Sequence, residues 1–581
     1  MPKIEVNEEL FYTLAGRAGG WKNRDEFEEI LTCAKAELDE DSDKSLPPGE
    51  RTLKIELNDT NRPDLWGTAG CARQLKVYSG GKTPEYAFFS KPGNVKKTTR
   101  KVRVLESVKK VRPFLAGFVA NGKSITDPML RDMIQTQEKL AWNFGRKRRS
   151  ISMGIYRISK VKWPVVYKGV DPNTVSSVPL QWDVPLTMSE ILKQHPKGKE
   201  YAFILENEPL HPLLTDSQDF IFSYPPIINS NDIGAVQVGD NEVFIELTGT
   251  DMPTLTLAAS IVACDLADNG FTIEPVEVEY EYDTPFGRNV ITPFYFQEPV
   301  FCSLARVEKF LGEKLSADEC VKALARMGVK AEKANDTERG QSGKGEGVRA
   351  WPPEYRNDFL HAADIAEDVM IGRSLASFKP QRPSDATVGR LLPVTLFSRQ
   401  VKENFIGLGY QEMIYNYLGS RKDLVENMRA GGDKIIRIFN PMTENYEYVR
   451  DSVLASLMSS ESISGRSAYP HKIFEVGKIA RLDEQENYRS ATRQYAGFLH
   501  AGTDANFNTT AGELQTLFYY LSREYEVEES DDPRFIPGRA ASILCNGKSI
   551  GVFGEIHPEV LENWGVTVPC TAGEIDLEAL I

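Results

Sequence analysis

Residues 348–380 read VRAWPPEYRNDFLHAADIAEDVMIGRSLASFKP, and this stretch places four carboxylates within eleven positions. They are Asp358, Asp364, Glu367 and Asp368, and the last three stand at i, i+3 and i+4. On a helix these three share one face, with Cβ atoms roughly 5–6 Å apart, so their charges repel. A hard cation that takes oxygen ligands, such as Mg²⁺, would turn that repulsion into binding. The stretch therefore indicates a helix that bears a magnesium site.

An ordinary amphipathic helix explains the same residues without a metal. Asp358 would then be an N-cap, and acidic residues in a first helical turn suit the helix dipole. Ile365, Val369 and Ile371 would form the buried stripe, and the acids a solvated face. The spacing alone leaves both interpretations open.

The whole chain has 581 residues, a formal net charge of −14 and the composition of a soluble globular protein. This length predicts several domains, roughly three to five. It contains no apolar run long enough to cross a membrane, and its N-terminus has no apolar signal core. Its seven cysteines include no C-x-x-C pair, which favours reduced thiols and argues against zinc. We therefore expect a cytoplasmic protein.

Three basic clusters interrupt the acidic chain. They are Lys96, Lys97, Arg100, Lys101 and Arg103; Lys109, Lys110 and Arg112; and Arg146, Lys147, Arg148 and Arg149. Each could neutralise phosphates of a nucleic acid. A solvated surface is the simpler interpretation of any basic run, so the clusters alone decide nothing.

Apolar periodicity predicts helices over residues 25–38, 67–78, 127–144 and 315–328. Alternation predicts strands over 53–57, 151–155 and 201–205, among others. Ser316 and Glu319 make a capping box for the last of these helices. Beyond the proline-rich linker at 379–393, the sequence predicts one large antiparallel α+β domain.

Two strands in the middle of the chain end in small polar groups. These groups are Ser223 and Asn229 in residues 220–229, and Glu246, Thr248 and Asp251 in residues 242–251. Hydroxyls and a carboxylate at the mouth of an apolar sheet suit a small-molecule pocket. Loop capping is an equally simple interpretation.

Five ordered segments resemble the β subunit of phenylalanyl-tRNA synthetase, in its archaeal/eukaryotic-type form. They are NDTNRPDL at 58–65; SYPPIIN at 223–229 with LTGTD at 247–251; PPEYRNDFLHAADIAEDV at 352–369; NPMT at 440–443 with YVRDS at 448–452; and FEVG at 474–477 with GEIHPEVL at 554–561. Together they span nearly the full chain, which makes the resemblance far more specific than any single motif.

The resemblance implies an α+β multidomain fold in four parts. They are an N-terminal α/β domain at 1–95, a mixed α/β editing domain (B3/B4-like) at 96–284, a small α/β accessory domain (B5-like) with the acidic helix at 285–382, and a degenerate class II synthetase-like antiparallel core at 383–581. In the third part, the family pattern of an acid followed by acids six, nine and ten positions later assigns Mg²⁺ to the four carboxylates quoted first.

The editing domain of the family hydrolyses tyrosine that has been mischarged onto phenylalanine tRNA. An apolar synthetic pocket cannot strongly reject an analogue that merely adds a hydroxyl, so a second site is needed. Matched by motif, Leu214, Ser223, Glu246 and Thr248 would line that site in this chain. The carboxylate would accept the phenol proton of tyrosine.

The last part resembles a class II core that lacks some of its catalytic residues. An active core needs an arginine on the ATP α-phosphate with a glutamate two positions later, but Arg450 is followed by Asp451 and Ser452. The resemblance therefore implies that phenylalanine and ATP bind a separate α subunit, in an α2β2 tetramer that also binds tRNA(Phe). The alternative function is a non-catalytic tRNA- or protein-binding scaffold.

Overall fold

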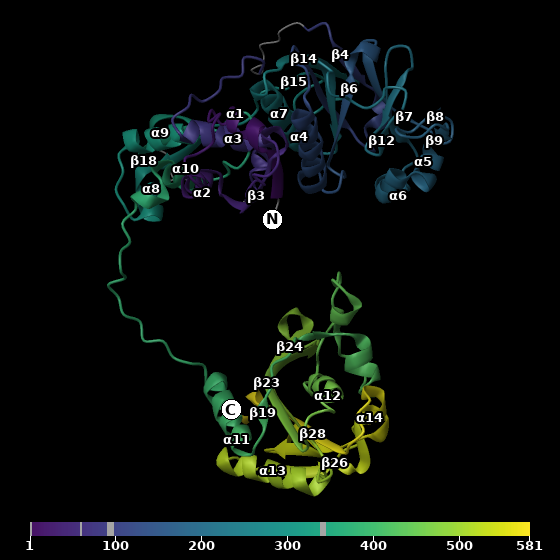
Figure 1. The fold of residues 1–581 in the computed structure, drawn as a ribbon, viewed down its shortest axis with the longest axis vertical. Coiled ribbons are helices and arrows are strands. Elements are labelled where there is room, and N and C mark those ends of the chain that lie inside the picture. The colour runs from purple at the N-terminus through teal and green to yellow at the C-terminus, as the bar shows by residue number, and fades with distance from the viewer. Residues whose placement is uncertain (1–2, 59–60, 90–97, 337–343) are drawn as a thin grey trace. The chain divides into compact units, whose positions relative to one another are not determined.

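The computed structural model describes residues 3–58, 61–89, 98–336 and 344–581. Lys96 and Lys97 of the first basic cluster lie outside these ranges. The chain divides into two compact units, Met1–Gln381 and Arg382–Ile581, each built from sheets and helices (Figure 1). The mixed α/β multidomain fold that the sequence predicts is confirmed at this level. None of the described helices combines the length and the apolar composition needed to cross a membrane.

Unit 1 begins with a small α/β module. Its three-stranded antiparallel sheet has the order β1-β3-β2, from β1 (Lys3–Asn7), β2 (Ala36–Glu40) and β3 (Thr52–Leu57). Its helices are α1 (Glu8–Leu14), α2 (Arg24–Leu31) and α3 (Thr68–Tyr78). The helix predicted over 25–38 is too long. Lys35 adopts a left-handed backbone with φ of 51°, and the residues after it pair with β3 as a strand.

A ten-stranded sheet follows in unit 1, with the order β12-β11-β10-β7-β4-β14-β5-β13-β6 and with β15 paired to β14. Its strands are β4 (Lys101–Val104), β5 (Phe114–Asn121), β6 (Ile151–Arg157), β7 (Val165–Val170), β10 (His211–Thr215), β11 (Ile221–Tyr224), β12 (Ile228–Asn229), β13 (Glu242–Gly249), β14 (Thr272–Tyr280) and β15 (Asn289–Thr292). Tyr156 of β6 and Phe222 of β11 have ring centroids 5.7 Å apart, although these strands lie toward opposite ends of that order. The sheet therefore curls and brings its ends face to face.

Helices and turns around this sheet differ in part from the prediction. Helix α7 (Met252–Asp268) packs on β5 and β13, and α4 (Asp127–Lys139) continues into a π-helical turn at Leu140–Phe144. The strand predicted over 201–205 is wrong. Helix α6 (Pro196–Tyr201), which Pro196 and the His195 cap begin, ends at Tyr201, and a 3-10 helix at Ala202–Ile204 takes up the rest of the segment.

The module that contains the acidic helix completes unit 1. Its sheet has the order β16-β18-β17, from β16 (Val300–Ser303), β17 (Lys330–Asp336) and β18 (Gly345–Trp351). Its helices are α8 (Leu304–Leu311), α9 (Ala317–Arg326) and α10 (Ala362–Arg373). The predicted capping box of α9 is confirmed, because Ser316 and Glu319 bond each other's backbone N–H groups at 3.3 and 2.8 Å.

One buried arginine ties the three modules of unit 1 together. Arg73 of α3 donates to Asp265 at 3.0 Å and to Asp268 at 2.7 Å, both on α7. Its guanidinium also lies 4.0 Å from the ring centroid of Tyr355, which precedes the acidic helix. These contacts explain why the first 381 residues form a single compact unit.

Unit 2 is built on a mostly antiparallel seven-stranded sheet of the order β19-β23-β24-β28-β27-β26-β25. Its strands are β19 (Gln411–Glu412), β23 (His471–Leu482), β24 (Ser490–Ala501), β25 (Glu526–Glu529), β26 (Phe535–Cys545), β27 (Lys548–Ile556) and β28 (Cys570–Asp576). Helices α12 (Leu454–Ile463) and α14 (Pro558–Trp564) share one apolar core with this sheet, and α11 (Pro393–Gly407) and α13 (Phe507–Tyr520) share another. Helices thus bury the sheet from two sides.

Candidate functional site

A pocket of about 370 Å³ opens where the two ends of the curled sheet face each other. Its lining residues include Tyr156 of β6, Ser223 of β11, Glu246 of β13 and His195. The volume lies within the usual range for small-molecule sites, roughly 300–1,000 Å³. Two of the four residues predicted for an editing pocket, Ser223 and Glu246, therefore meet in one cavity.

The register of β13 on β6 places the functional side chains on one face. Glu246 pairs with Gly154, and Thr248 with Ser152, while Tyr156 follows two positions after the glycine. A Cβ on Gly154 would lie 2.0 Å from the Tyr156 hydroxyl and 2.8 Å from a carboxylate oxygen of Glu246. The glycine therefore leaves the space in which the phenol reaches the carboxylate.

Glu246 is the main polar group of the pocket. Its side chain is buried, and its Oε2 accepts the Tyr156 hydroxyl at 2.9 Å. Its Oε1 has no hydrogen-bond partner among the described residues. Burial raises the pKa of Glu246 to about 7, against the opposing effects of the Tyr156 hydrogen bond and the Arg112 charge. Glu246 therefore lines the pocket and keeps one carboxylate oxygen, Oε1, without a hydrogen-bond partner among the described residues.

Ser223 and Asn229 lie on the opposite wall, where the Ser223 hydroxyl donates to the Asn229 side-chain oxygen at 3.2 Å. Leu214 pairs with Ser223 across the sheet but is fully buried in the apolar core behind it. Asp251 accepts the Thr254 N–H and so caps α7. Each of the two interpretations of the sequence is therefore correct for some residues. Ser223, Asn229 and Glu246 line a pocket, and Asp251 is a helix cap.

Thr248 is held by a buried arginine and does not line the pocket. Arg112 donates to the Thr248 hydroxyl at 2.9 Å and to its carbonyl at 2.6 Å. It also donates to the carbonyls of Arg148 and Arg149, at 3.1 and 3.0 Å. Burial lowers the pKa of Arg112 to about 10, so it stays charged at neutral pH. Its placement in a phosphate-binding cluster is therefore wrong, because only 1% of the residue is exposed.

The other residues of the basic clusters differ in their surroundings: some are paired with carboxylates and others are exposed. Arg100 pairs with Glu242 at 2.9 Å, and Lys101 pairs with Glu277 at 3.1 Å, both along the sheet. Arg146, Lys147 and Arg149 are instead exposed, and Arg148 between them in sequence lines the pocket. The third cluster thus remains the basic surface nearest the candidate site.

The four carboxylates of the predicted metal set, Asp358 before α10 and the other three on it, have several partners. Arg356, itself buried, donates to Asp358 at 2.9 and 2.6 Å and to Asp368 at 2.7 Å. A protein guanidinium therefore already balances the two buried members of the predicted metal set.

The other two carboxylates have separate roles. Asp364 accepts the N–H groups of Leu360 and His361 at 2.7 and 2.6 Å, so it caps α10 in place of Asp358. The Oε1 atom of Glu367 lies 2.7 Å from the ammonium nitrogen of Lys35. Hard carboxylate oxygens suit Mg²⁺, but within the described ranges no three acidic, His or Cys side chains are grouped as a metal site. Arg356 and Lys35 thus already pair with three of the four carboxylates, and the magnesium site stays a prediction.

Arg450 in unit 2 is also fully engaged. It is buried and makes two bonds to Glu475, at 2.7 and 2.8 Å. It donates as well to the carbonyl of Lys478 at 3.0 Å. The guanidinium therefore supports β23.

Comparison with known proteins agrees with this geometry. A family model described as the tRNA synthetase B5 domain matches residues 300–373, and one described as the phenylalanyl tRNA synthetase beta chain CLM domain matches residues 379–577. These matches define the class, a chain of a tRNA synthetase.

Relatives and a solved structure narrow the assignment. The chain is 43% identical to the "Phenylalanine--tRNA ligase beta subunit" of Treponema pallidum and to that of Borrelia hermsii, and each alignment covers 100% of both chains. An N-terminal fragment of the phenylalanyl-tRNA synthetase beta subunit from Pyrococcus horikoshii shares 33% identity with a TM-score of 0.56, over 64% of this chain and 99% of the fragment. The chain belongs to the phenylalanine–tRNA ligase beta subunit family.

Two pocket residues, Gly154 and Tyr156, were missed as functional by sequence reasoning. Both lie in or just beyond the predicted strand at 151–155, and the alternation that predicts the strand places them on the face of Ser152. The missing information was the register, which sets Gly154 opposite Glu246.

Proposed function

We propose that this chain hydrolyses tyrosyl-tRNA(Phe) in the pocket and supports the ATP-dependent charging of tRNA(Phe) with phenylalanine by an alpha subunit. The buried, unpartnered Oε1 of Glu246 in the pocket wall carries the editing part of the proposal. A tyrosine phenol can donate to this oxygen. Phenylalanine cannot, and would leave a buried acceptor unpaired, which a site of this kind rejects strongly.

The chemistry required is hydrolysis of one ester bond. Water adds to the carbonyl carbon of the tyrosyl group, the bond to the ribose oxygen breaks, and the ribose oxygen takes a proton. Glu246 would hold the phenol, and Ser223 and Asn229, which line the same pocket, would lie near the rest of the tyrosyl group. Thr248 acts through Arg112, by fixing β13 in position. The pocket thereby selects the substrate by positioning it for attack by water.

A deacylation assay tests the editing activity. Tyrosyl-tRNA(Phe) and phenylalanyl-tRNA(Phe) are incubated with the chain alone and with the chain co-expressed with an alpha subunit. We expect hydrolysis of the tyrosyl ester and little of the phenylalanyl ester. Absence of tyrosyl hydrolysis from both preparations would refute the editing function and favour a non-catalytic tRNA- or protein-binding scaffold.

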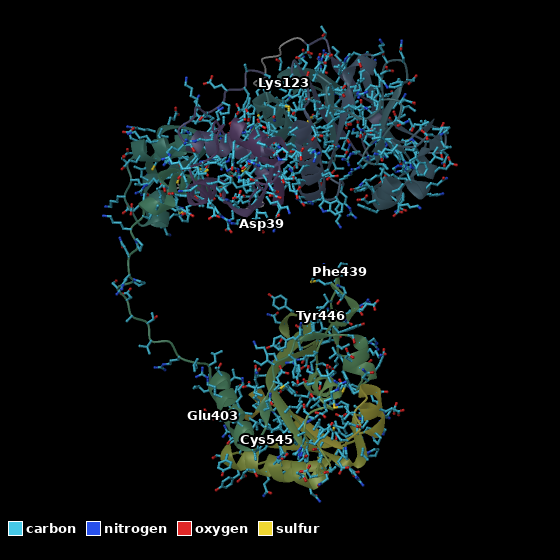
Figure 2. All side chains as sticks on the ribbon, viewed as in Figure 1. Asp39, Lys123, Glu403, Phe439, Tyr446 and Cys545 are labelled. Atoms are coloured by element: carbon cyan, nitrogen blue, oxygen red, sulfur yellow. The ribbon has the colours of Figure 1, made fainter. Side chains whose placement is uncertain are left out.

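An alpha-subunit partner is supported by the surface of unit 2. Large apolar side chains there are exposed, including Phe439 and Tyr446, which Figure 2 shows at one end of the unit, and Met442 between them in sequence. Exposed apolar side chains gathered at one place are typical of protein interfaces. With Arg450 bound to Glu475, we propose that unit 2 is a class II-like core without its own ATP site, in an α2β2 tetramer whose alpha subunits bind phenylalanine and ATP. Failure to co-purify with an alpha subunit would contradict this assembly.

We further propose the archaeal/eukaryotic-type domain arrangement, with boundaries near 95, 284 and 382. It is supported by the match to the Pyrococcus horikoshii fragment, although the two curated relatives compared above come from bacteria.

For the acidic helix we keep magnesium binding by Asp358, Asp364, Glu367 and Asp368 as a proposal, supported by the density of carboxylates and by the family of the chain. Because Arg356 and Lys35 already pair with three of these carboxylates, the ion would have to replace protein cations. Calorimetric titration of the chain with MgCl₂ tests this, and absence of binding would leave protein cations, Arg356 and Lys35, as the partners of these carboxylates.

A further inference from the structure

A small cavity lies between α4, β6 and α7, on the side of α7 that Arg73 contacts. Its volume is about 20 Å³, which is enough for one water molecule or one small ion. Met153 of β6 lines both this cavity and the candidate pocket. Whatever fills the cavity therefore also supports one wall of the pocket.

Two helices present polar side chains to this cavity in matching pairs. Asp132 and Thr136 stand at i and i+4 on α4, and Asp265 and Asn269 stand at i and i+4 on α7. Residues at this spacing share one face of a helix. The rest of the lining is apolar, namely Met133, Met153, Ile155, Val262 and Leu266.

Each carboxylate keeps one oxygen without a partner among the described residues. The Oδ1 atom of Asp132 accepts the Thr68 N–H and hydroxyl at 2.9 and 2.6 Å, and its Oδ2 accepts no bond. The Oδ1 atom of Asp265 accepts an Arg73 N–H at 3.0 Å, and its Oδ2 likewise accepts none. Both residues are less than 10% exposed.

The two neutral side chains are also unpartnered within the described part of the chain. Thr136 is 6% exposed, and its hydroxyl makes no hydrogen bond. The Oδ1 atom of Asn269 is buried and accepts no bond, while its Nδ2 donates to the Asp265 carbonyl at 2.9 Å and so fixes the orientation of the amide. Because buried polar groups are normally hydrogen-bonded, unpaired oxygens around one cavity indicate a water or an ion.

Negative charge is in excess around the cavity. Arg73 is shared by Asp265 and Asp268, at 3.0 and 2.7 Å, and Asp132 forms no ion pair with a described residue. Burial raises the pKa of Asp265 to about 8, with the Arg73 charge opposing the rise and the Asp132 charge adding to it. The site is therefore stabilised by any further positive charge that can enter it.

A small metal cation satisfies these groups better than a proton, a water molecule or Mg²⁺. A proton shared by the carboxylates would leave the Thr136 and Asn269 oxygens unpaired. A water molecule has two hydrogens for three acceptor oxygens and brings no charge. Mg²⁺ usually keeps several of its waters, and a cavity of this size has no room for them.

We propose that the cavity binds one dehydrated monovalent cation of the size of sodium, held by side-chain oxygens of Asp132, Thr136, Asp265 and Asn269. The ion would join α4 to α7 and, through Asp265 and Arg73, to α3 of the N-terminal module. Neither the editing function nor magnesium binding by the acidic helix is required for it.

Thermal unfolding of the full-length chain in different salts tests this site. The chain is heated at pH 8.5, above the pKa of Asp265, in NaCl, KCl or N-methylglucamine chloride at equal ionic strength, with EDTA to remove divalent ions. Thr136→Val removes the hydroxyl at nearly constant shape, and Thr136→Ser is the matched control that keeps it. The line width of the ²³Na NMR signal reports sodium binding to each chain directly.

We expect the unaltered chain to unfold about 2 °C higher in NaCl than in N-methylglucamine chloride, because an ion that binds only the folded state stabilises it. The larger potassium ion should raise Tm less. Thr136→Val should lose the sodium effect and the broadening of the ²³Na signal, and Thr136→Ser should keep both. If Thr136→Val does not fold, Asp132→Asn, which retains an Oδ1 acceptor for Thr68, should show the same loss.

Equal Tm values in the three salts, with no ²³Na broadening by the unaltered chain, would overturn the proposal. A sodium effect that persists in Thr136→Val or Asp132→Asn would refute this cavity as the binding site. Stabilisation by lower pH that is equal in all three salts, without a sodium effect, would show that a proton occupies the carboxylate pair in place of a metal ion.

Discussion

Replacement of Glu246 by glutamine tests the physical basis of substrate selection. The change keeps the shape of the side chain and the bond from Tyr156, but it removes the charge of the buried acceptor. A hydrogen bond to a charged group contributes roughly 1.5–3 kcal/mol, so kcat/KM for tyrosyl-tRNA(Phe) should fall about 10- to 150-fold. Hydrolysis of the phenylalanyl ester should not fall, because that substrate makes no such bond.

The same variant should change the pH dependence of editing. Burial raises the pKa of Glu246 from its ordinary value of 4.5 to about 7. The acceptor is therefore mostly neutral at pH 6 and mostly ionised at pH 8, and kcat/KM of the unaltered chain should rise through pH 7. The glutamine variant should lack this rise. Identical pH profiles for the two chains would refute the assignment of Glu246 as the titrating acceptor.

The free energy of unfolding should change with pH in the opposite direction to kcat/KM. Because the folded state binds the Glu246 proton more tightly than the unfolded state, ionisation destabilises the fold as pH rises from 4.5 to 7. The rise in pKa corresponds to about 3 kcal/mol at pH 8. Thermal unfolding at pH 5 and pH 8 should therefore show a smaller loss of stability for Glu246→Gln than for the unaltered chain. An equal loss in both would contradict the burial argument.

Three further changes test neighbouring features. Gly154→Ala places a methyl group against the Tyr156 hydroxyl, so it should abolish tyrosyl hydrolysis and cost about 1–3 kcal/mol in thermal unfolding. Arg112→Met leaves the carbonyls of Thr248, Arg148 and Arg149 without their buried donor. It should lower the free energy of unfolding by about 3 kcal/mol or more and reduce editing. Unchanged thermal unfolding would refute the structural role of Arg112. Asp364→Ala/Glu367→Ala should weaken calorimetric Mg²⁺ binding without changing deacylation, and unchanged Mg²⁺ affinity would exclude both as ligands.

Local signals in the sequence predicted much of the fold correctly. The capping box at Ser316 set the start of α9, and the apolar strand predicted in residues 242–251 is β13, which carries Glu246. The strand predicted at 201–205 failed because α6, begun by Pro196 and the His195 cap, runs to Tyr201 and is followed by a 3-10 helix at Ala202–Ile204. The helix over 25–38 failed because pairing with β3 outweighed helical periodicity.

The site was harder to predict because it depends on pairing between distant strands. Nothing in the sequence near Gly154 shows that it lies opposite Glu246, or that the sheet curls until Tyr156 approaches Phe222. Burial likewise decided the role of Arg112, which looks in the sequence like a member of a basic surface. Runs of charged residues in the sequence were therefore a poor guide to the site. Strand register and burial, which the sequence does not show, decided which residues form it.

The position of a bound tyrosine tests the central claim most directly. A crystal structure of the chain with a non-hydrolysable tyrosyl-adenosine analogue would show the phenol and Glu246 together. We predict the phenol oxygen within about 3 Å of the Oε1 atom that now lacks a partner. A tyrosyl group bound elsewhere, or one whose phenol points away from Glu246, would contradict the account.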